Sequence, residues 1–135
     1  MKEIELDAKI ANLFKVTAFV EEFAQLSGCP MEAITQLNIV VDEIFSNIAK
    51  YAYPDGAGKV KVLVEKTENP KCIRLTFIDW GIQYDPLAKA DPDITLPEQE
   101  RQIGGLGIFM VKKTMDSMKY THENGQNILV LEKCF

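Results

Sequence analysis

The chain has 135 residues, of which 47% are hydrophobic and 26% charged, and its net charge is −5 at pH 7. These values fit one globular domain over residues 1–135 that can bury a core without added cross-links. The acidic balance argues against nucleic-acid binding, and neither a signal-peptide core nor an apolar stretch of the roughly 20 residues that span a membrane is present.

The three cysteines, Cys29, Cys72 and Cys134, are far apart in the sequence. Their spacing matches neither a metal site nor a disulfide framework, which favours a reducing compartment. We therefore expect a cytoplasmic protein whose cysteines are small buried side chains.

The first quarter of the chain predicts a strand followed by a helix. Polar and apolar residues alternate from Lys2 to Leu6, as in a short edge strand. Asp7 is the predicted cap of a helix that runs to about Ser27 and stops at Gly28. The apolar residues of this helix recur at helical spacing: Leu13, Val16, Val20, Phe23 and Leu26.

A second helix is predicted from Met31 to Tyr53, between the break at Cys29-Pro30 and a strong turn at residues 53–56. Its apolar stripe steps by three and four residues: Ile34, Leu37, Val41, Ile44 and Ile48. Glu43 and Asn47 lie four residues apart, so their side chains leave the same face, at the edge of that stripe.

Two strands are predicted next, over residues 59–66 and 72–80, joined by a turn at Glu68-Asn69-Pro70. In the second strand, Asp79 has the same parity as the apolar residues Ile73, Leu75 and Phe77. If the strand stays regular, the carboxylate points into the covered layer and needs a hydrogen-bonding partner. If the strand ends earlier, the carboxylate faces water.

The stretch from residue 81 to 107 is irregular, and we interpret Leu87 to Ile103 as a lid. A helix follows from Gly107 to Asp116, and two strands at 118–122 and 127–133 are joined around Asn124-Gly125. The apolar residues 128–131 suit a central strand. This order of elements predicts an α+β fold, a two-layer sandwich whose mostly antiparallel sheet has helices on one face.

Two groups of residues could carry chemistry. The run Gly104-Gly105-Leu106-Gly107 opens a helix and is either an anion-binding loop or a flexible hinge. Glu43 is a candidate general base and Asn47 a candidate Mg²⁺ ligand, or both are solvated on an exposed helix face.

Three segments in combination resemble the GHKL ATPase superfamily, and within it the anti-sigma-factor serine/threonine kinases. VVDEIFSNIAKYAYPDG resembles the asparagine box of the family, DWGIQYDP its first glycine box and GGLGIFMVKKTMD its second. They occur in the family order, with a lid-length gap, and the resemblance covers essentially the whole chain. It implies the Bergerat-type fold, with ATP and Mg²⁺ as cofactors.

The resemblance also implies residue roles. Glu43 would accept the hydroxyl proton of a protein serine or threonine, Asn47 would reach the Mg²⁺ on the ATP phosphates, and Asp79 would bind the adenine amino group. The other implied nucleotide-binding positions are Lys50, Gly81, Tyr84, Gly104, Gly105, Leu106 and Gly107. One departure is Gly125-Gln126-Asn127, where many members have a hydroxyl residue near the adenine.

The implied function is an ATP-dependent protein serine/threonine kinase that phosphorylates an antagonist protein and binds a sigma factor in a partner-switching pathway. The resemblance further suggests a homodimer through the N-terminal strand and helix. The alternative is a nucleotide-regulated binding module that sequesters a regulator without transferring phosphate. The presence of Glu43 favours the kinase. The ATPase domain of a two-component histidine kinase is disfavoured because no helical phospho-acceptor domain accompanies it.

Overall fold

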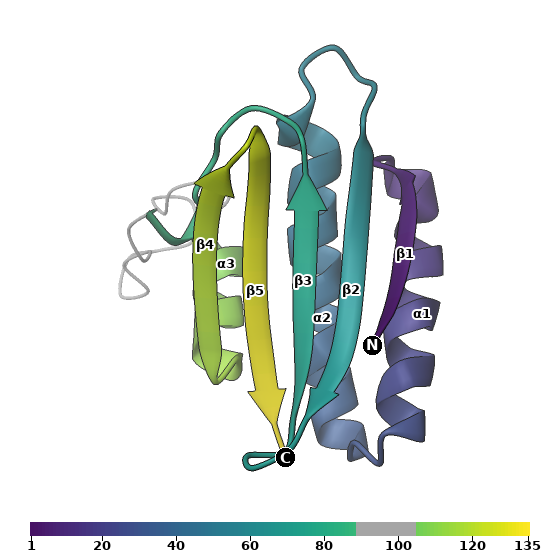
Figure 1. Cartoon of the computed structure of the whole chain (residues 1–135). Helices are drawn as coiled ribbons and strands as arrows, with labels where there is room; N and C mark the ends of the chain where they lie inside the picture. Colours follow the sequence, from purple (N-terminus) through teal and green to yellow (C-terminus); the bar gives the residue numbers. More distant parts are fainter. Residues whose placement is uncertain (89–104) are drawn as a thin grey trace.

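The computed structural model describes residues 1–88 and 105–135, and within these residues five strands form one sheet (Figure 1). The strands are β1 (Lys2–Asp7), β2 (Lys59–Thr67), β3 (Cys72–Asp79), β4 (Ser117–Glu123) and β5 (Gln126–Cys134). Their order is β1-β2-β3-β5-β4, and every neighbouring pair is antiparallel.

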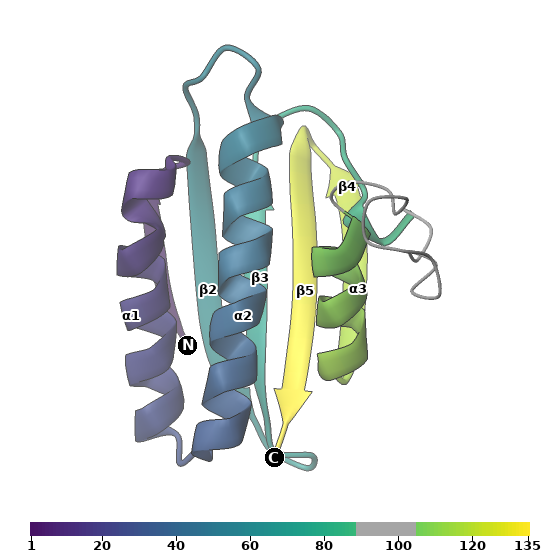
Figure 2. The same cartoon turned by 180° about the vertical axis from the view of Figure 1, so that it is seen from behind.

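Three α-helices of the described chain cover one face of this sheet: α1 (Leu13–Leu26), α2 (Met31–Asn47) and α3 (Gly105–Thr114). Figure 1 shows α1 and α2 side by side behind β1 to β3, with α3 behind β4 and β5, and Figure 2 shows the same helices from the other side, in front of the sheet. Short 3-10 turns occur at Ile10–Asn12 and Pro86–Ala88. The predicted two-layer α+β sandwich is confirmed.

The core lies between the helices and the sheet, as the sequence periodicities predict. In β2, the valines at positions 60, 62 and 64 face the helices and are fully buried. The α2 stripe is buried at Ile34, Leu37, Val41 and Ile44, and Ile48 packs against its edge. Helix α3 contributes Ile108 and Val111, which joins the third helix to the same core.

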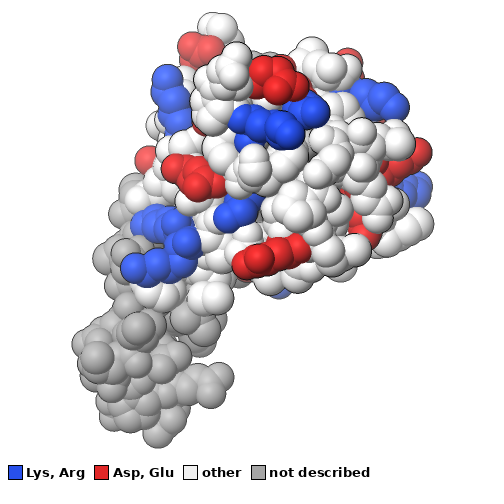
Figure 3. All heavy atoms as spheres, turned by 90° about the horizontal axis from the view of Figure 1, so that it is seen from below, with Lys and Arg blue, Asp and Glu red and all other residues white. Residues whose placement is uncertain are grey.

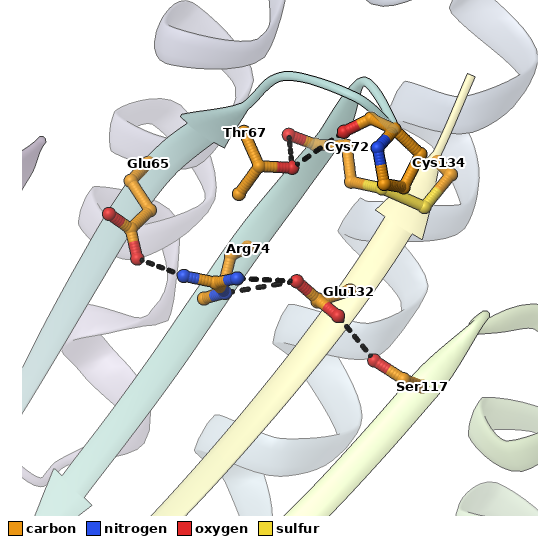
Figure 4. A network of polar contacts seen from close by, with 8 residues as sticks. Glu65, Thr67, Cys72, Arg74, Ser117, Glu132 and Cys134 are labelled. Carbon is orange, nitrogen blue, oxygen red and sulfur yellow. Dashed lines mark hydrogen bonds and ion pairs between the residues drawn. A yellow bond between two sulfur atoms is a disulfide. The ribbon is translucent and has the colours of Figure 1, made fainter.

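The opposite face of the sheet has no helix of the described chain over it and carries a polar ladder across four strands (Figure 4). Arg74 donates to Glu132 from Nε at 3.0 Å and to Glu65 from Nη1 at 2.9 Å. Ser117 donates its hydroxyl to the other oxygen of Glu132 at 2.7 Å. The side chain of Arg74 is 38% exposed, so this ladder is half open to water.

The cysteine prediction is wrong for two of the three residues. Cys72 and Cys134 form a disulfide between β3 and β5, whereas Cys29 is a buried free thiol, as predicted. The pair is separated by 62 residues in sequence, but the register of β3 and β5 places the two residues directly opposite each other. The cysteines therefore no longer support the prediction of a reducing compartment.

The predicted helix cap at Asp7 is also wrong. Strand β1 continues through Asp7, whose carboxylate pairs with Lys59 of the adjacent strand at 2.8 Å. Helix α1 begins only at Leu13, and Asn12 at its N-cap makes no side-chain capping bond. Strand β1 is therefore one residue longer than predicted, and Lys59 stabilises this last residue as a cross-strand partner of opposite charge.

The other boundaries agree with the sequence within one or two residues, when the π-helical stretch Ile48–Ala52 that continues α2 is counted as helix. Strand β5 lies between β3 and β4, as expected for a strand that is apolar on both faces. Asn124 and Gly125 join β4 to β5 with φ of 52° and 75°, in the left-handed region. Of the predicted lid, residues 89–103 lie outside the described residues.

The described surface carries charges of both signs, as the composition of the chain leads one to expect. On the end of the molecule seen in Figure 3, acidic and basic side chains are interspersed over the described part. Among the helices of residues 1–88 and 105–135, none combines the length and the apolar character needed to cross a membrane.

Candidate functional site

The site begins where α2 changes its winding. The α-helix ends at Asn47 and continues as one π-helical stretch, Ile48–Ala52. Single π turns inside helices occur often at functional sites, because the wider turn re-aims the side chains around it. Here the last α-helical turn carries Glu43 and Asn47, and the π stretch carries Lys50 and Tyr51.

Asn47, Asp79 and Tyr84, three of the predicted site residues, line a single pocket with an empty volume of about 480 Å³, including space open to solvent. They come from α2, from the end of β3 and from the loop that follows β3. The rest of the lining is mostly apolar: Ile44, Ile48, Tyr51, Ala52, Phe77, Ile82, Pro86, Tyr120, Asn127 and Leu129. An apolar cleft with a few convergent polar groups is the usual form of a small-molecule site.

Asp79 is the last residue of β3 and is buried, with 5% of its surface exposed. The strand stays regular to its end, so the inward parity holds and the carboxylate has partners. Its Oδ1 accepts from the backbone N–H of Gly81 and from the amide Nδ2 of Asn127, both at 2.9 Å. These two bonds offset the cost of burying the carboxylate.

Gly81 lies directly against the backbone of Ala52, at the end of the π stretch. A methyl group at Gly81 would overlap the carbonyl oxygen of Ala52. The same carbonyl accepts a hydrogen bond from the N–H of Ile82 at 2.8 Å. The glycine thus allows the loop after β3 to be fastened to the end of α2, which brings the two walls of the pocket together.

The side chain of Glu43 reaches from α2 to the first turn of α3. Asn47 donates from Nδ2 to Oε1 of Glu43 at 3.1 Å. A methyl group at Gly107 would overlap the carboxyl group of Glu43, so the glycine leaves the space that the carboxylate occupies. Glu43 therefore borders the positive end of the α3 dipole, where an anion or a developing charge is favoured.

The remaining predicted residues differ in their placement. Lys50 is exposed and does not line the pocket. Gly105 and Leu106 form the first turn of α3, whereas Gly104 lies outside the described residues. The described part of the glycine run, Gly105 to Gly107, opens a helix, as the sequence predicts, and the structure adds that Gly107 lies beside Glu43.

Three tyrosines belong to the site or support it. Burial, and then the nearby carboxylate of Glu43, raise the pKa of Tyr84 above its ordinary value. Tyr53 donates its hydroxyl to the carbonyl of Lys59 and accepts the N–H of Trp80 at 2.8 Å, and burial raises its pKa. Tyr120 donates to Asn127 at 2.6 Å.

Tyr51, Tyr120 and Asn127 line the pocket although the sequence did not lead us to expect them there. A signal for Asn127 was present, because it shares its parity with the buried residues Leu129 and Leu131. Tyr51 had no such signal, since its position depends on the π stretch, which periodicity does not predict.

Within residues 1–88 and 105–135, no group of three His, Cys, Asp or Glu side chains could hold a metal ion. Asn47 uses its Nδ2 to donate to Glu43, and its Oδ1 accepts no hydrogen bond from the described residues. An amide oxygen of this kind suits Mg²⁺ that is bound mainly by phosphates.

The chain is similar to known proteins over nearly its whole length. It is 24% identical over 132 residues to the proteins named serine-protein kinase RsbW from Bacillus cereus (strain AH820) and Bacillus thuringiensis (strain Al Hakam), covering 95% of this chain and 81% of each relative. The solved RsbU and RsbW domains of a Mycobacterium tuberculosis protein share the fold, with a TM-score of 0.63 at 16% identity over 98% of this chain and 32% of that chain. The family model described as histidine kinase-like ATPase domain matches residues 6–133. The chain therefore belongs to the histidine kinase-like ATPase domain family.

Proposed function

We propose that this protein is an ATP-dependent serine/threonine protein kinase that phosphorylates an antagonist protein in a partner-switching pathway. The observation that carries the proposal is the convergence of Asn47, Asp79 and Tyr84 on one pocket, with Glu43 beside Asn47 at its border. Family membership supports ATP binding, and the relatives named serine-protein kinases support phosphoryl transfer to a protein.

In this proposal the adenine binds at the buried end of the pocket, where Asp79 accepts a hydrogen bond from its amino group and Gly81 allows close approach. Tyr84 covers the base. The phosphates extend towards the first turn of α3, where the backbone N–H groups at Gly105, Leu106 and Gly107 attract them. Lys50 adds positive charge from the exposed side, and Asn47 supplies an oxygen ligand to Mg²⁺.

Glu43 would act as the base. As the serine or threonine oxygen of the substrate forms a bond to the γ-phosphorus, the bond from that phosphorus to the bridging oxygen of ADP breaks. The hydroxyl proton passes to the carboxylate of Glu43. Bound Mg²⁺ would neutralise phosphate charge, and the rest of catalysis is positioning and electrostatic stabilisation.

The proposed partners are a small antagonist protein as substrate and a sigma factor or another regulator as the second ligand, in the cytoplasm. A homodimer through the N-terminal strand and helix belongs to the same proposal. It is supported by an exposed apolar groove over α1 and the 3-10 turn before it, which contains Phe14 and Ile10, and these two residues are 67% and 49% exposed.

The deciding experiment incubates the protein with γ-labelled ATP, Mg²⁺ and antagonist-type domains from the same genome. Transfer of label to serine or threonine is expected. Glu43→Gln keeps the acceptor for Asn47, so ATP affinity should stay within about threefold while transfer falls by at least about 10². The matched control is Glu32→Gln, an exposed position on the same helix, which should transfer at the normal rate.

The alternative is a nucleotide-regulated binding module. The binding-module function would be established if ATP bound and changed the affinity of the protein for a regulator, while none of the antagonist proteins gained phosphoserine or phosphothreonine. A large loss of ATP affinity in Glu43→Gln would instead remove Glu43 from the role of base.

A further inference from the structure

The hydroxyl of Tyr53 joins the ends of two strands. Tyr53 follows directly after the π stretch, and its hydroxyl donates to the carbonyl of Lys59, the first residue of β2. The same hydroxyl accepts the backbone N–H of Trp80, the residue after β3, at 2.8 Å. In Figure 1 this junction lies at the upper end of β2 and β3. A phenol can donate and accept at the same time, and a phenylalanine ring can do neither.

The hydroxyl stands where the sheet would otherwise continue. Strands β2 and β3 pair in register as far as Val60 and Asp79, so the next pair in this register would be Lys59 and Trp80. A hydrogen bond from the N–H of Trp80 to the carbonyl of Lys59 would form this next pair. Both of these backbone groups bind the hydroxyl of Tyr53 instead.

The direction of the backbone at the start of β2 supports this interpretation. The carbonyl of Gly58 accepts the N–H of Ala8 at 2.9 Å, so the backbone groups of Gly58 face the chain that follows β1. Backbone groups of successive residues in an antiparallel sheet point alternately to the two neighbouring strands, so those of Lys59 face β3. The hydroxyl of Tyr53 is therefore inserted between two groups that are directed at each other.

The loop after β3 turns towards α2 at this point. Ala52 precedes Tyr53, packs against Gly81 and accepts the N–H of Ile82 at 2.8 Å. Two consecutive residues at the end of the π stretch thus hold three consecutive residues after Asp79. One wall of the pocket belongs to α2 and the π stretch, and another belongs to this loop. The contacts at residues 52 and 53 therefore set the spacing between these two walls.

The ring of Tyr53 has its place against the backbone of Gly58. A methyl group at Gly58 would overlap this ring. The ring is also held through the two hydrogen bonds of its hydroxyl, so it cannot yield to a methyl group without breaking them. Gly58 thereby provides a second way to displace the hydroxyl, without removing it from the side chain.

We propose that Tyr53 is a positioning residue of the nucleotide pocket, whose hydroxyl ends the pairing of β2 with β3 and so keeps the following loop against the end of α2. The inference rests on the proposed nucleotide-binding function and adds to it the residue that sets the spacing of the pocket walls. Tyr53 itself does not line the pocket, so it acts through the loop. Without the hydroxyl, Trp80 can pair directly with Lys59, and the loop moves away from Ala52.

The first test measures ATP affinity by calorimetry on the full chain. Tyr53→Phe should weaken ATP binding about tenfold, the effect of losing the contacts between the loop and Ala52. Gly58→Ala should weaken it to a similar extent. The matched control Thr67→Val removes a hydroxyl at the other end of β2, where Thr67 donates to the carbonyl of Pro70 at 3.0 Å, and should keep the wild-type affinity.

Kinetics separate positioning from a general loss of structure. In Tyr53→Phe the KM for ATP should rise about tenfold, while kcat at saturating ATP stays within about twofold, because Glu43 and α3 are not displaced. Amide hydrogen exchange by NMR gives a local measurement. The N–H of Ile82 should exchange at least about tenfold faster in the variant, whereas that of Ala8, which binds Gly58 on the other side of β2, should keep its rate.

A folded Tyr53→Phe that binds ATP within about twofold of the wild-type affinity would overturn the inference and leave the kinase proposal standing. If thermal melting shows that this variant does not fold, Gly58→Ala decides by the same criterion. A fall in kcat with an unchanged KM would also overturn it, because the loop would then not hold the nucleotide. A wild type that binds no ATP would overturn both proposals.

Discussion

At the scale of single residues, two glycines of the site differ in what an added methyl group would meet. At Gly81 the methyl would overlap the backbone of Ala52, which cannot move without shifting the π stretch. At Gly107 it would overlap the carboxyl group of Glu43, the end of a side chain that can rotate away. The same substitution should therefore affect stability at one position and activity at the other.

Gly81→Ala should lower the free energy of unfolding by about 1–3 kcal/mol, because overpacking against backbone forces the loop and the helix end apart. Urea denaturation monitored by circular dichroism would measure this loss. Unchanged stability would mean that the loop does not pack against Ala52 as described.

Gly107→Ala should change the free energy of unfolding by no more than about 1 kcal/mol, since alanine also favours the helix. Phosphoryl transfer should fall at least about tenfold, because the carboxylate of Glu43 is displaced from its place beside α3. Kinase assays run beside the urea experiment would separate the two effects. A Gly107→Ala variant that is unstable but fully active when folded would contradict this assignment.

At the scale of elements, the strands and their inward faces could be predicted because alternation and the covered sheet face coincide. The parity of Asp79 allowed an inward carboxylate only if the strand stayed regular to its end, and the sequence left this open. The α2 stripe predicted that Glu43 and Asn47 lie at its edge. The Asp7 cap failed because a residue that suits a helix cap also suits a strand end opposite Lys59. The π stretch after Asn47 ends at Ala52, which contacts Gly81 and Ile82 of a distant loop, and local spacing contains no information on such contacts.

The polar ladder on the open sheet face makes a pH-dependent contribution to stability. The hydroxyl of Ser117 and then Arg74 lower the pKa of Glu132, against an opposing effect of burial. A carboxyl group whose pKa is lower in the folded state stabilises the protein above its unfolded pKa of about 4.3, and this contribution disappears as the pH falls through the folded pKa.

Glu132→Gln should thus lower the free energy of unfolding by up to about 1 kcal/mol at pH 7, a small value because Arg74 is 38% exposed. The difference from the wild type should stay constant down to about pH 5 and shrink below about pH 4.3. Urea denaturation at a series of pH values measures it. Glu68→Gln, whose side chain is 66% exposed, is the control and should show no comparable difference at pH 7.

At the scale of the whole molecule, β3 and β5 connect two features at opposite ends of the sheet. Asp79 and Asn127 lie opposite each other at one end, and Cys72 and Cys134 lie opposite each other at the other. Neither pairing could be predicted from the sequence, because both depend on the register of strands that are about 50 to 60 residues apart along the chain. The fold class could be predicted from the sequence, because it depends on the order of strands and helices and not on how the strands are aligned with one another.

Reduction of the disulfide should lower stability without affecting the pocket. For a closed loop of this size, the expected loss in the free energy of unfolding is about 2–4 kcal/mol. Urea denaturation with and without dithiothreitol would measure it, and ATP affinity should stay unchanged because the pocket is at the far end of the strands. Mass spectrometry after alkylation of the unfolded, unreduced chain should find one modified cysteine, Cys29; three modified cysteines would show that the disulfide does not form.

Strand β1 forms one border of the sheet, and its backbone groups on the outer side are not paired with a neighbouring strand of the described chain. Lys2, Glu3, Glu5 and Asp7 are all exposed along this border. A foreign strand that added its backbone to this border would have to desolvate these charges. The acidic border therefore opposes growth of the sheet into fibrils, and this is a task that the first seven residues perform in addition to packing Ile4 and Leu6 against the core.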